Sequence, residues 1–207
     1  MNAPILPEIR KGRKFDQVLE GAWKVFLEKG FEGASVDDIA RSAGVSKATL
    51  YSYFPDKRLL FLEVAKGECK RQADAAFDVI DLSGPPGDVL TQAASKLVRF
   101  FLSDFGQQMY RTCVSECYRF PEVGSEFYAS GPGLVQERLA SYLTEATTRG
   151  VLNVDDPMLA AAQLQELCKA DIHVRLVCGI QQDFSENEIN RIVSGAVDMF
   201  MARYGTT

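Results

Sequence analysis

Two short helical patterns separated by a glycine-containing turn constrain this 207-residue chain more than any other feature. Ser35-Val36-Asp37-Asp38 has the form of a capping box and begins the first pattern. Gly44-Val45-Ser46 is typical of a tight turn, and a second short helix is expected from Lys47 to Phe54. Leu50 and Phe54 stand four residues apart and predict one buried face. This spacing predicts a helix-turn-helix, which lays one helix across a phosphate backbone and projects the other into a major groove.

The outward side of the second short helix carries residue types that suit duplex DNA better than plain solvent. Its side chains are Ser46, Lys47, Thr49, Tyr51 and Tyr53, and Ala48 leaves room for close approach. Hydroxyl groups, aromatic rings and a lysine reach phosphates and base edges, whereas a solvated helix face is usually built of Glu and Lys. Taken singly, each tyrosine could be an ordinary surface residue; taken together at this spacing, the set predicts DNA binding.

The net charge of −5 becomes informative when it is divided along the chain. Residues 1–60 hold ten Lys and Arg against eight Asp and Glu, and residues 61–207 hold thirteen against twenty. Phosphate affinity needs local positive charge, so the asymmetry permits DNA binding at the N-terminal end and argues against a polyanion lying across the rest. The basic arm at residues 10–14 suits either a minor-groove contact or a solubilising terminus.

The remainder of the chain keeps a helical period, and no segment alternates as a strand would. A long helix is expected from Lys57 to about Ile80, and Ser83 to Gly87 form the clearest break. Further helices are expected over 134–149, over 157 to about 178, and after the capping box at Ser185. The pattern therefore predicts an all-α protein of about nine helices.

The residues of the predicted helix-turn-helix strongly resemble the TetR family of transcriptional regulators. The resemblance is carried by Ser35-Val36-x-x-Ile39-Ala40, by the run from Ala43 to Phe54 (AGVSKATLYSYF), and by Lys57-x-x-Leu60. It implies an N-terminal DNA-binding domain over 1–56 and a larger helical ligand-binding and dimerisation domain over 57–207.

The same resemblance implies roles for individual side chains. Ser35 and Lys57 would contact phosphates, and Tyr51 would press its ring on the sugar-phosphate backbone. Lys47, Thr49 and Tyr53 would face the groove. Arg58 departs from the family pattern, which commonly has Glu there, and adds positive charge near the backbone.

The segment Glu116 to Val123, followed by Phe127-Tyr128, is similar to the C-terminal domain of AefR-like members of the family. The family resemblance implies a homodimer formed through the last two helices and an apolar pocket for a small-molecule inducer. The candidate pocket residues are Phe101, Phe105, Met109, Cys113, Tyr142 and His173. Bulky apolar residues at helical spacing are also typical of plain core, and this alternative stays open.

The chain lacks the residue patterns of an enzyme. It has one histidine, no nucleophile motif and no glycine-rich phosphate loop, so we expect no catalytic residues. The five cysteines lack zinc-ligand spacing, and we expect neither a metal nor a cofactor. Cys113 and Cys117 are interpreted as reduced core residues, with redox sensing as the alternative.

The sequence shows neither a secretion signal nor an apolar run of membrane-spanning length, so we expect a cytoplasmic protein. The family resemblance implies a homodimeric repressor that a small molecule releases from a palindromic operator. The alternative is a ligand-independent accessory or architectural DNA-binding protein on the same fold.

Overall fold

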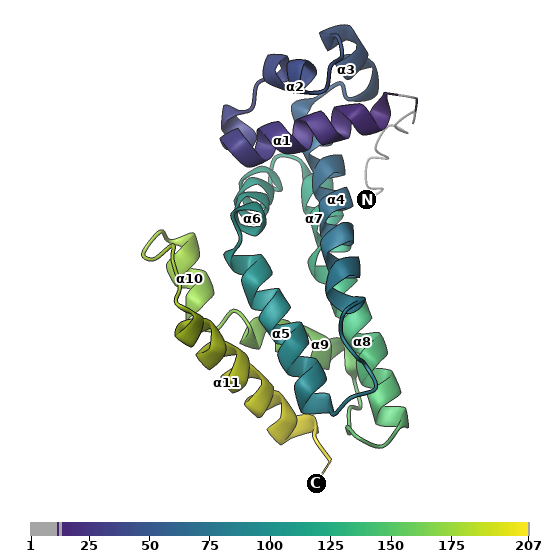
Figure 1. Ribbon diagram of the computed structural model, residues 1–207, viewed down its shortest axis with the longest axis vertical. Coiled ribbons are helices and arrows are strands. Elements are labelled where there is room, and N and C mark those ends of the chain that lie inside the picture. Colours follow the sequence, from purple (N-terminus) through teal and green to yellow (C-terminus); the bar gives the residue numbers. More distant parts are fainter. Residues whose placement is uncertain (1–11, 13, 207) are drawn as a thin grey trace. The chain divides into compact units, whose positions relative to one another are not determined.

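The computed structural model describes residue 12 and residues 14–206 of the chain, and within this part it is built of helices (Figure 1). The helices are α1 (Phe15–Gly33), α2 (Val36–Ser42), α3 (Lys47–Tyr53), α4 (Lys57–Phe77), α5 (Pro86–Leu102), α6 (Asp104–Glu116), α7 (Pro121–Ser130), α8 (Pro132–Thr148), α9 (Pro157–Leu167), α10 (Ile172–Val177) and α11 (Glu186–Tyr204). The expected all-α class is confirmed. Extended pairing in the described residues is limited to one isolated bridge between Leu152 and Gly205.

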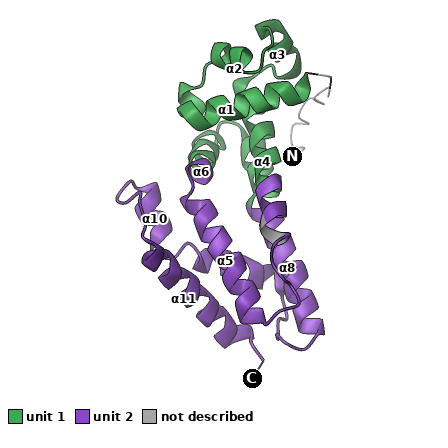
Figure 2. Cartoon of the chain, viewed as in Figure 1, with its two compact units in different colours: residues 1–70, 108–131 green, residues 71–107, 132–207 purple. Residues whose placement is uncertain are grey.

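The helices are distributed over two compact units, shown in two colours in Figure 2. The first unit combines residues 1–70 with 108–131, and the second combines residues 71–107 with 132–207. The first unit therefore contains α1–α3 together with α7 and parts of α4 and α6. The boundary expected after residue 56 divides the chain into the two domains that the family resemblance implies, and it stays a prediction.

The first unit is held together by aromatic packing and by one close helix approach. Phe26, Phe31 and Phe61 form a three-ring cluster with centroid distances of 5.1–6.2 Å. A Cβ placed on Gly21 of α1 would lie 2.5 Å from the backbone nitrogen of Ala43, so only glycine lets the two segments meet this closely. Gly30 has a positive φ of 69° and marks a kink within α1.

The second unit has its core where α11 packs on α5 and α9, and where α8 packs on α9. Fully enclosed side chains include Leu90, Leu143 and Leu164. The predicted capping box at the start of α11 is confirmed: the Ser185 hydroxyl accepts from the Glu188 amide, and the Glu188 carboxylate accepts from the Ser185 amide at 2.9 Å. These local bonds set the first turn of the last helix.

The helix expected over 157–178 was predicted wrongly as one element. It begins as foreseen, with the Asp156 side chain accepting from the Leu159 amide, but α9 ends at Leu167 and α10 begins at Ile172. Asp171 between them has a φ of 68°, a left-handed backbone that a continuous helix excludes. The α7 helix, which begins at Pro121, is not among the helices named from the sequence, although proline is favoured at a first helical position.

Three further expectations from the sequence concern membrane-spanning helices, metal ligands and the basic arm. A helix long and apolar enough to cross a bilayer is not found among the described residues. The part of the chain that the structure describes also holds no group of three metal-ligating side chains. Arg10, Lys11 and Arg13 of the basic arm lie outside the described residues.

Candidate nucleic-acid interface

The α3 helix is oriented by one buried and one exposed face. Leu50 and Phe54 are buried, as their spacing predicted. Gly44 turns the chain between α2 and α3 with a φ of 63°, and the Ser46 hydroxyl caps α3 by accepting from the Thr49 amide at 3.1 Å. The predicted outward residues Ser46, Lys47, Ala48 and Tyr51 are all exposed. The first unit therefore presents a hydroxyl, a cation and an aromatic ring on one short helix.

Two of the predicted residues are less accessible than the others. The Tyr53 ring is half-buried and packs edge-on against Phe15 of α1, with centroids 6.0 Å apart. Thr49 is half-buried, and its hydroxyl lies 2.9 Å from the Ser46 hydroxyl. Tyr51 differs, since 49% of its surface is exposed. The ring most available to a partner on α3 is therefore that of Tyr51.

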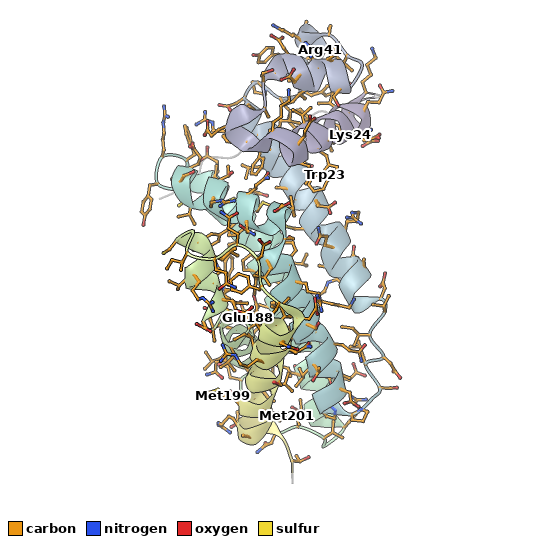
Figure 3. All side chains as sticks on the ribbon, turned by 60° about the vertical axis from the view of Figure 1, so that its left-hand side comes forward. Trp23, Lys24, Arg41, Glu188, Met199 and Met201 are labelled. Carbon is orange, nitrogen blue, oxygen red and sulfur yellow. The ribbon has the colours of Figure 1, made fainter. Side chains whose placement is uncertain are left out.

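The N-terminus of α2 carries Ser35 inside a small charged network. The Ser35 hydroxyl accepts from the Asp38 amide at 3.1 Å and donates to the Asp38 carboxylate at 2.8 Å. That carboxylate also binds Lys29 at 2.9 Å and Arg41 at 3.0 Å (Arg41 is labelled in Figure 3). Its pKa lies below the usual range, chiefly because of the hydrogen bond from Lys29. Lys29 and Arg41 thus offset the negative charge of this carboxylate.

Lys47 pairs with Asp37 of α2 in the described residues, and both side chains are more than half exposed. Exposed pairs of this kind contribute little to stability and are screened by salt. Sequence reasoning missed the partners Asp37, Asp38, Lys29 and Arg41. The signal that could have found them is the alternation of acidic and basic residues around the short α2 helix.

Lys57 occupies an unexpected position at the C-terminal end of α1. Its Nζ donates to the backbone oxygens of Phe31 at 2.8 Å and Ala34 at 3.1 Å, and lies 4.4 Å from the centroid of the Phe31 ring. Carbonyls at a helix C-terminus carry partial negative charge and favour a cation. The ammonium therefore joins the start of α4 to the end of α1, which the family resemblance did not indicate.

The six candidate pocket residues are divided between the units. Met109 and Cys113 are buried in the first unit, whereas Phe101, Phe105, Tyr142 and His173 belong to the second. Within the second unit, the rings of Phe101 and His173 meet edge to face at 6.5 Å, and Lys169 Nζ lies 5.5 Å from the centroid of the Phe101 ring. The pKa of His173 is lowered, first by burial and then by Lys169. A pocket shared by all six residues stays a prediction.

This geometry defines a class of protein. Leu50 and Phe54 bury one face of α3, its other face carries a hydroxyl, a lysine and a tyrosine, and a glycine turn sets it against α2. This is the geometry of a helix-turn-helix, the motif of a class of DNA-binding proteins. Comparison with known proteins then gives the family. The model for bacterial regulatory proteins of the TetR family matches residues 18–64, and the model for the AefR-like transcriptional repressor C-terminal domain matches residues 88–206. The chain belongs to the TetR family.

Solved structures extend the similarity along the chain. A TetR-family regulator from Mesorhizobium loti is 28% identical, with a TM-score of 0.85, over 94% of this chain and 98% of that one. The flavonoid-responsive regulator FrrA is 36% identical, with a TM-score of 0.75, over the same shares. The repressor AcnR of Corynebacterium diphtheriae is 32% identical over 75 residues, which make up 36% of this chain and 40% of AcnR.

Proposed function

We propose that this chain is a transcriptional repressor that binds duplex operator DNA through α3. The exposed face of α3 carries the proposal, since Lys47 and Tyr51 stand outward while Leu50 and Phe54 anchor the helix from behind. The proposed DNA-binding residues are Ser35, Ser46, Lys47, Ala48, Thr49, Tyr51, Tyr53 and Lys57. Operator DNA of a bacterial regulator lies in the cytoplasm, and a cytoplasmic location is part of this proposal.

In this proposal each contact follows from the chemistry of the side chain. Ser35 would contact a phosphate at the start of α2. Lys47 would exchange Asp37 for the duplex, and Ala48 would permit close approach. Tyr51 would donate its hydroxyl to the backbone. Two of the three donors of the Lys57 ammonium are used at α1, and the third would reach a phosphate.

We further propose a homodimer formed by the last two helical segments, α9–α10 and α11. Apolar side chains remain exposed on them: Met158 and Leu159 on α9, and Met199 on α11, with 63% of its surface exposed. Met199 is labelled in Figure 3. A subunit contact through these helices would cover these side chains. A two-fold dimer would present its recognition helices to major grooves about 34–36 Å apart on a palindromic site.

The ligand proposal starts from a solved relative. The printed name of FrrA describes a flavonoid-responsive regulator, and FrrA is similar to this chain over nearly its whole length. We propose that a small aromatic molecule bound in the C-terminal domain weakens DNA binding, and flavonoids are the first class to test. Ligand and DNA would then be linked by a coupling free energy without touching each other.

The experiment selects duplex fragments from a random pool with the purified chain and measures affinity for the selected duplex across a salt series. Lys47→Ala is compared with Lys24→Ala, an exposed lysine of α1 paired with Glu20. We expect salt-sensitive binding that Lys47→Ala weakens and Lys24→Ala leaves unchanged. Equal loss in the two variants, or no salt-sensitive affinity of the wild type for any duplex, would refute the proposal.

Adding a panel of flavonoids to the protein–DNA complex tests the proposed class of ligand. Release by a member of the panel supports an inducible repressor. The alternative function is a ligand-independent accessory DNA-binding protein. It predicts that neither the flavonoids nor a wider panel of small molecules releases the chain from the duplex.

A further inference from the structure

Arg58 holds the carboxylate of Asp56 at the start of α4. Its Nε donates to both Asp56 carboxylate oxygens at 3.0 Å, its Nη2 also bonds that group, and its backbone amide donates to Oδ1 at 2.8 Å. Asp56 lies just beyond the end of α3, after Phe54 and Pro55. One side chain therefore fixes the turn between the recognition helix and the long helix that follows it.

The flat face of the same guanidinium covers a ring from a distant part of the sequence. The Arg58 Cζ lies 3.3 Å from the centroid of the Phe120 ring. Phe120 precedes α7 and is fixed to the end of α6 by its amide, which donates to the backbone oxygen of Glu116 at 2.8 Å. Guanidinium groups suit this double use, since their edge bonds a carboxylate while their face stacks on a ring.

The charges around Arg58 agree with this arrangement. Asp56 is its hydrogen-bonded partner, and the carboxylates of Glu116 and Glu122 also stabilise its positive charge. These three acidic residues come from the α3–α4 turn, the end of α6 and the first turn of α7. A cation at position 58 therefore holds together three segments of the first unit, whereas a carboxylate there would repel all three.

We propose that Arg58 is a positioning residue through which the α6–α7 segment sets the orientation of α3. The inference rests on the proposed DNA binding and adds a route for its regulation. Arg58 lies within the part of the chain that matches the TetR N-terminal model, and Phe120 lies within the part that matches the AefR-like C-terminal model. Their contact is the point where a change in α6–α7 reaches the base of the recognition helix inside one compact unit.

Direct phosphate binding by Arg58 is the competing role, and conservative variants separate the two. Arg58→Lys keeps the positive charge but loses the planar guanidinium face and the paired N–H donors that bond the Asp56 carboxylate. We expect Arg58→Lys, Arg58→Gln and Phe120→Leu each to weaken binding to the selected duplex by roughly tenfold. The slope of log affinity against log salt should stay unchanged, and Phe120→Tyr should keep wild-type affinity. Arg111→Gln, at an exposed arginine of α6, is the matched control and should have no effect.

The double variant Arg58→Gln/Phe120→Leu should bind no more weakly than Arg58→Gln alone, because that substitution already removes the contact with Phe120. A slope reduced by about 0.9 in Arg58→Gln, with recovery in Arg58→Lys, would instead identify a phosphate contact and overturn the proposal. Additive losses in the double variant would also overturn it.

Hydrogen exchange tests the positioning role without DNA. We expect faster amide exchange over residues 47–54 and 120–124 in both Arg58→Gln and Phe120→Leu, while exchange over 186–204 stays as in the wild type. Unchanged exchange over 47–54 would refute the role. A wild-type chain that binds no duplex would remove the proposed function, whereas the exchange result would still decide the positioning role.

Discussion

The ammonium of Lys57 lies 2.8 Å from the backbone oxygen of Phe31, twenty-six residues earlier in the chain. With its second bond to Ala34 and the Phe31 ring beneath it, this side chain closes the end of α1 and connects it to α4. The residue that the family resemblance assigns to DNA therefore also has a structural role in the protein alone. Its substitution will change both stability and binding, and the two effects need separate measurements.

Replacing Lys57 with Ala should lower the free energy of unfolding by about 1–2 kcal/mol, because half-buried bonds from a charged donor are lost. Urea unfolding without DNA measures this effect. If the third donor reaches a phosphate, the salt slope of DNA binding should also fall by about 0.9. If stability falls while the salt slope of DNA binding stays unchanged, Lys57 contacts α1 but no phosphate.

Gly21→Ala should destabilise the first unit by about 1–3 kcal/mol, because the new Cβ would lie 2.5 Å from the backbone nitrogen and 2.6 Å from the Cα of Ala43. Gly67→Ala is the matched control. Gly67 lies in α4 with open space around its Cβ position, so alanine should stabilise the helix there by about 0.5–1 kcal/mol. We expect the denaturant midpoint to fall in Gly21→Ala and to rise in Gly67→Ala. An unchanged midpoint in Gly21→Ala would contradict the close approach of α1 and α2.

The two tyrosines of α3 should separate binding from folding. Tyr51→Ala should keep the free energy of unfolding within about 0.5 kcal/mol of the wild type and weaken duplex binding, since the ring is exposed. Tyr53→Ala should cost about 1–2 kcal/mol, since its ring packs on Phe15. Tyr53→Phe keeps the ring and should restore the stability. Equal unfolding midpoints for the two alanine variants would show that Tyr53 does not support α1.

Stability of the second unit should depend on pH through Glu188. Hydrogen bonds from the Ser185 amide and hydroxyl lower the pKa of this carboxyl from 4.5 to about 2. Its contribution is therefore complete above about pH 4.5 and declines as the pH falls toward 2. Glu188→Gln should flatten that part of the stability curve, measured by urea unfolding at several pH values. A variant that keeps the full acid dependence would show that other carboxyl groups cause it.

The cysteines should differ sharply in reactivity. Burial raises the pKa of Cys69, Cys113 and Cys168 to about 12, so their reactive thiolates are scarce at neutral pH. Cys178 is exposed. We expect iodoacetamide at pH 8 to label Cys178 first and Cys113 only on unfolding, as read by peptide mass spectrometry. Rapid oxidation of Cys113 with Cys117 in the folded protein would support the redox alternative instead.

The sequence determined the elements that depend on near neighbours. The Ser46 and Ser185 caps bond three residues ahead, and Leu50 and Phe54 share a face because they are four apart; such relations can be seen in the order of residues alone. The same reasoning gave the all-α class and the exposure of Ser46, Lys47, Ala48 and Tyr51, but it did not foresee that Thr49 and Tyr53 are half-buried. It failed between residues 168 and 171, where helical spacing continues although the backbone of Asp171 does not.

Only the tertiary structure decided which groups those side chains meet. Lys57 and Arg58 are adjacent in the sequence, yet one bonds the end of α1 and the other covers Phe120. Tyr51 and Tyr53 are two residues apart, yet one is exposed and the other packs on Phe15. The physical reason is common to these cases: each partner comes from a distant segment, and its position depends on how whole helices pack, which no local pattern encodes.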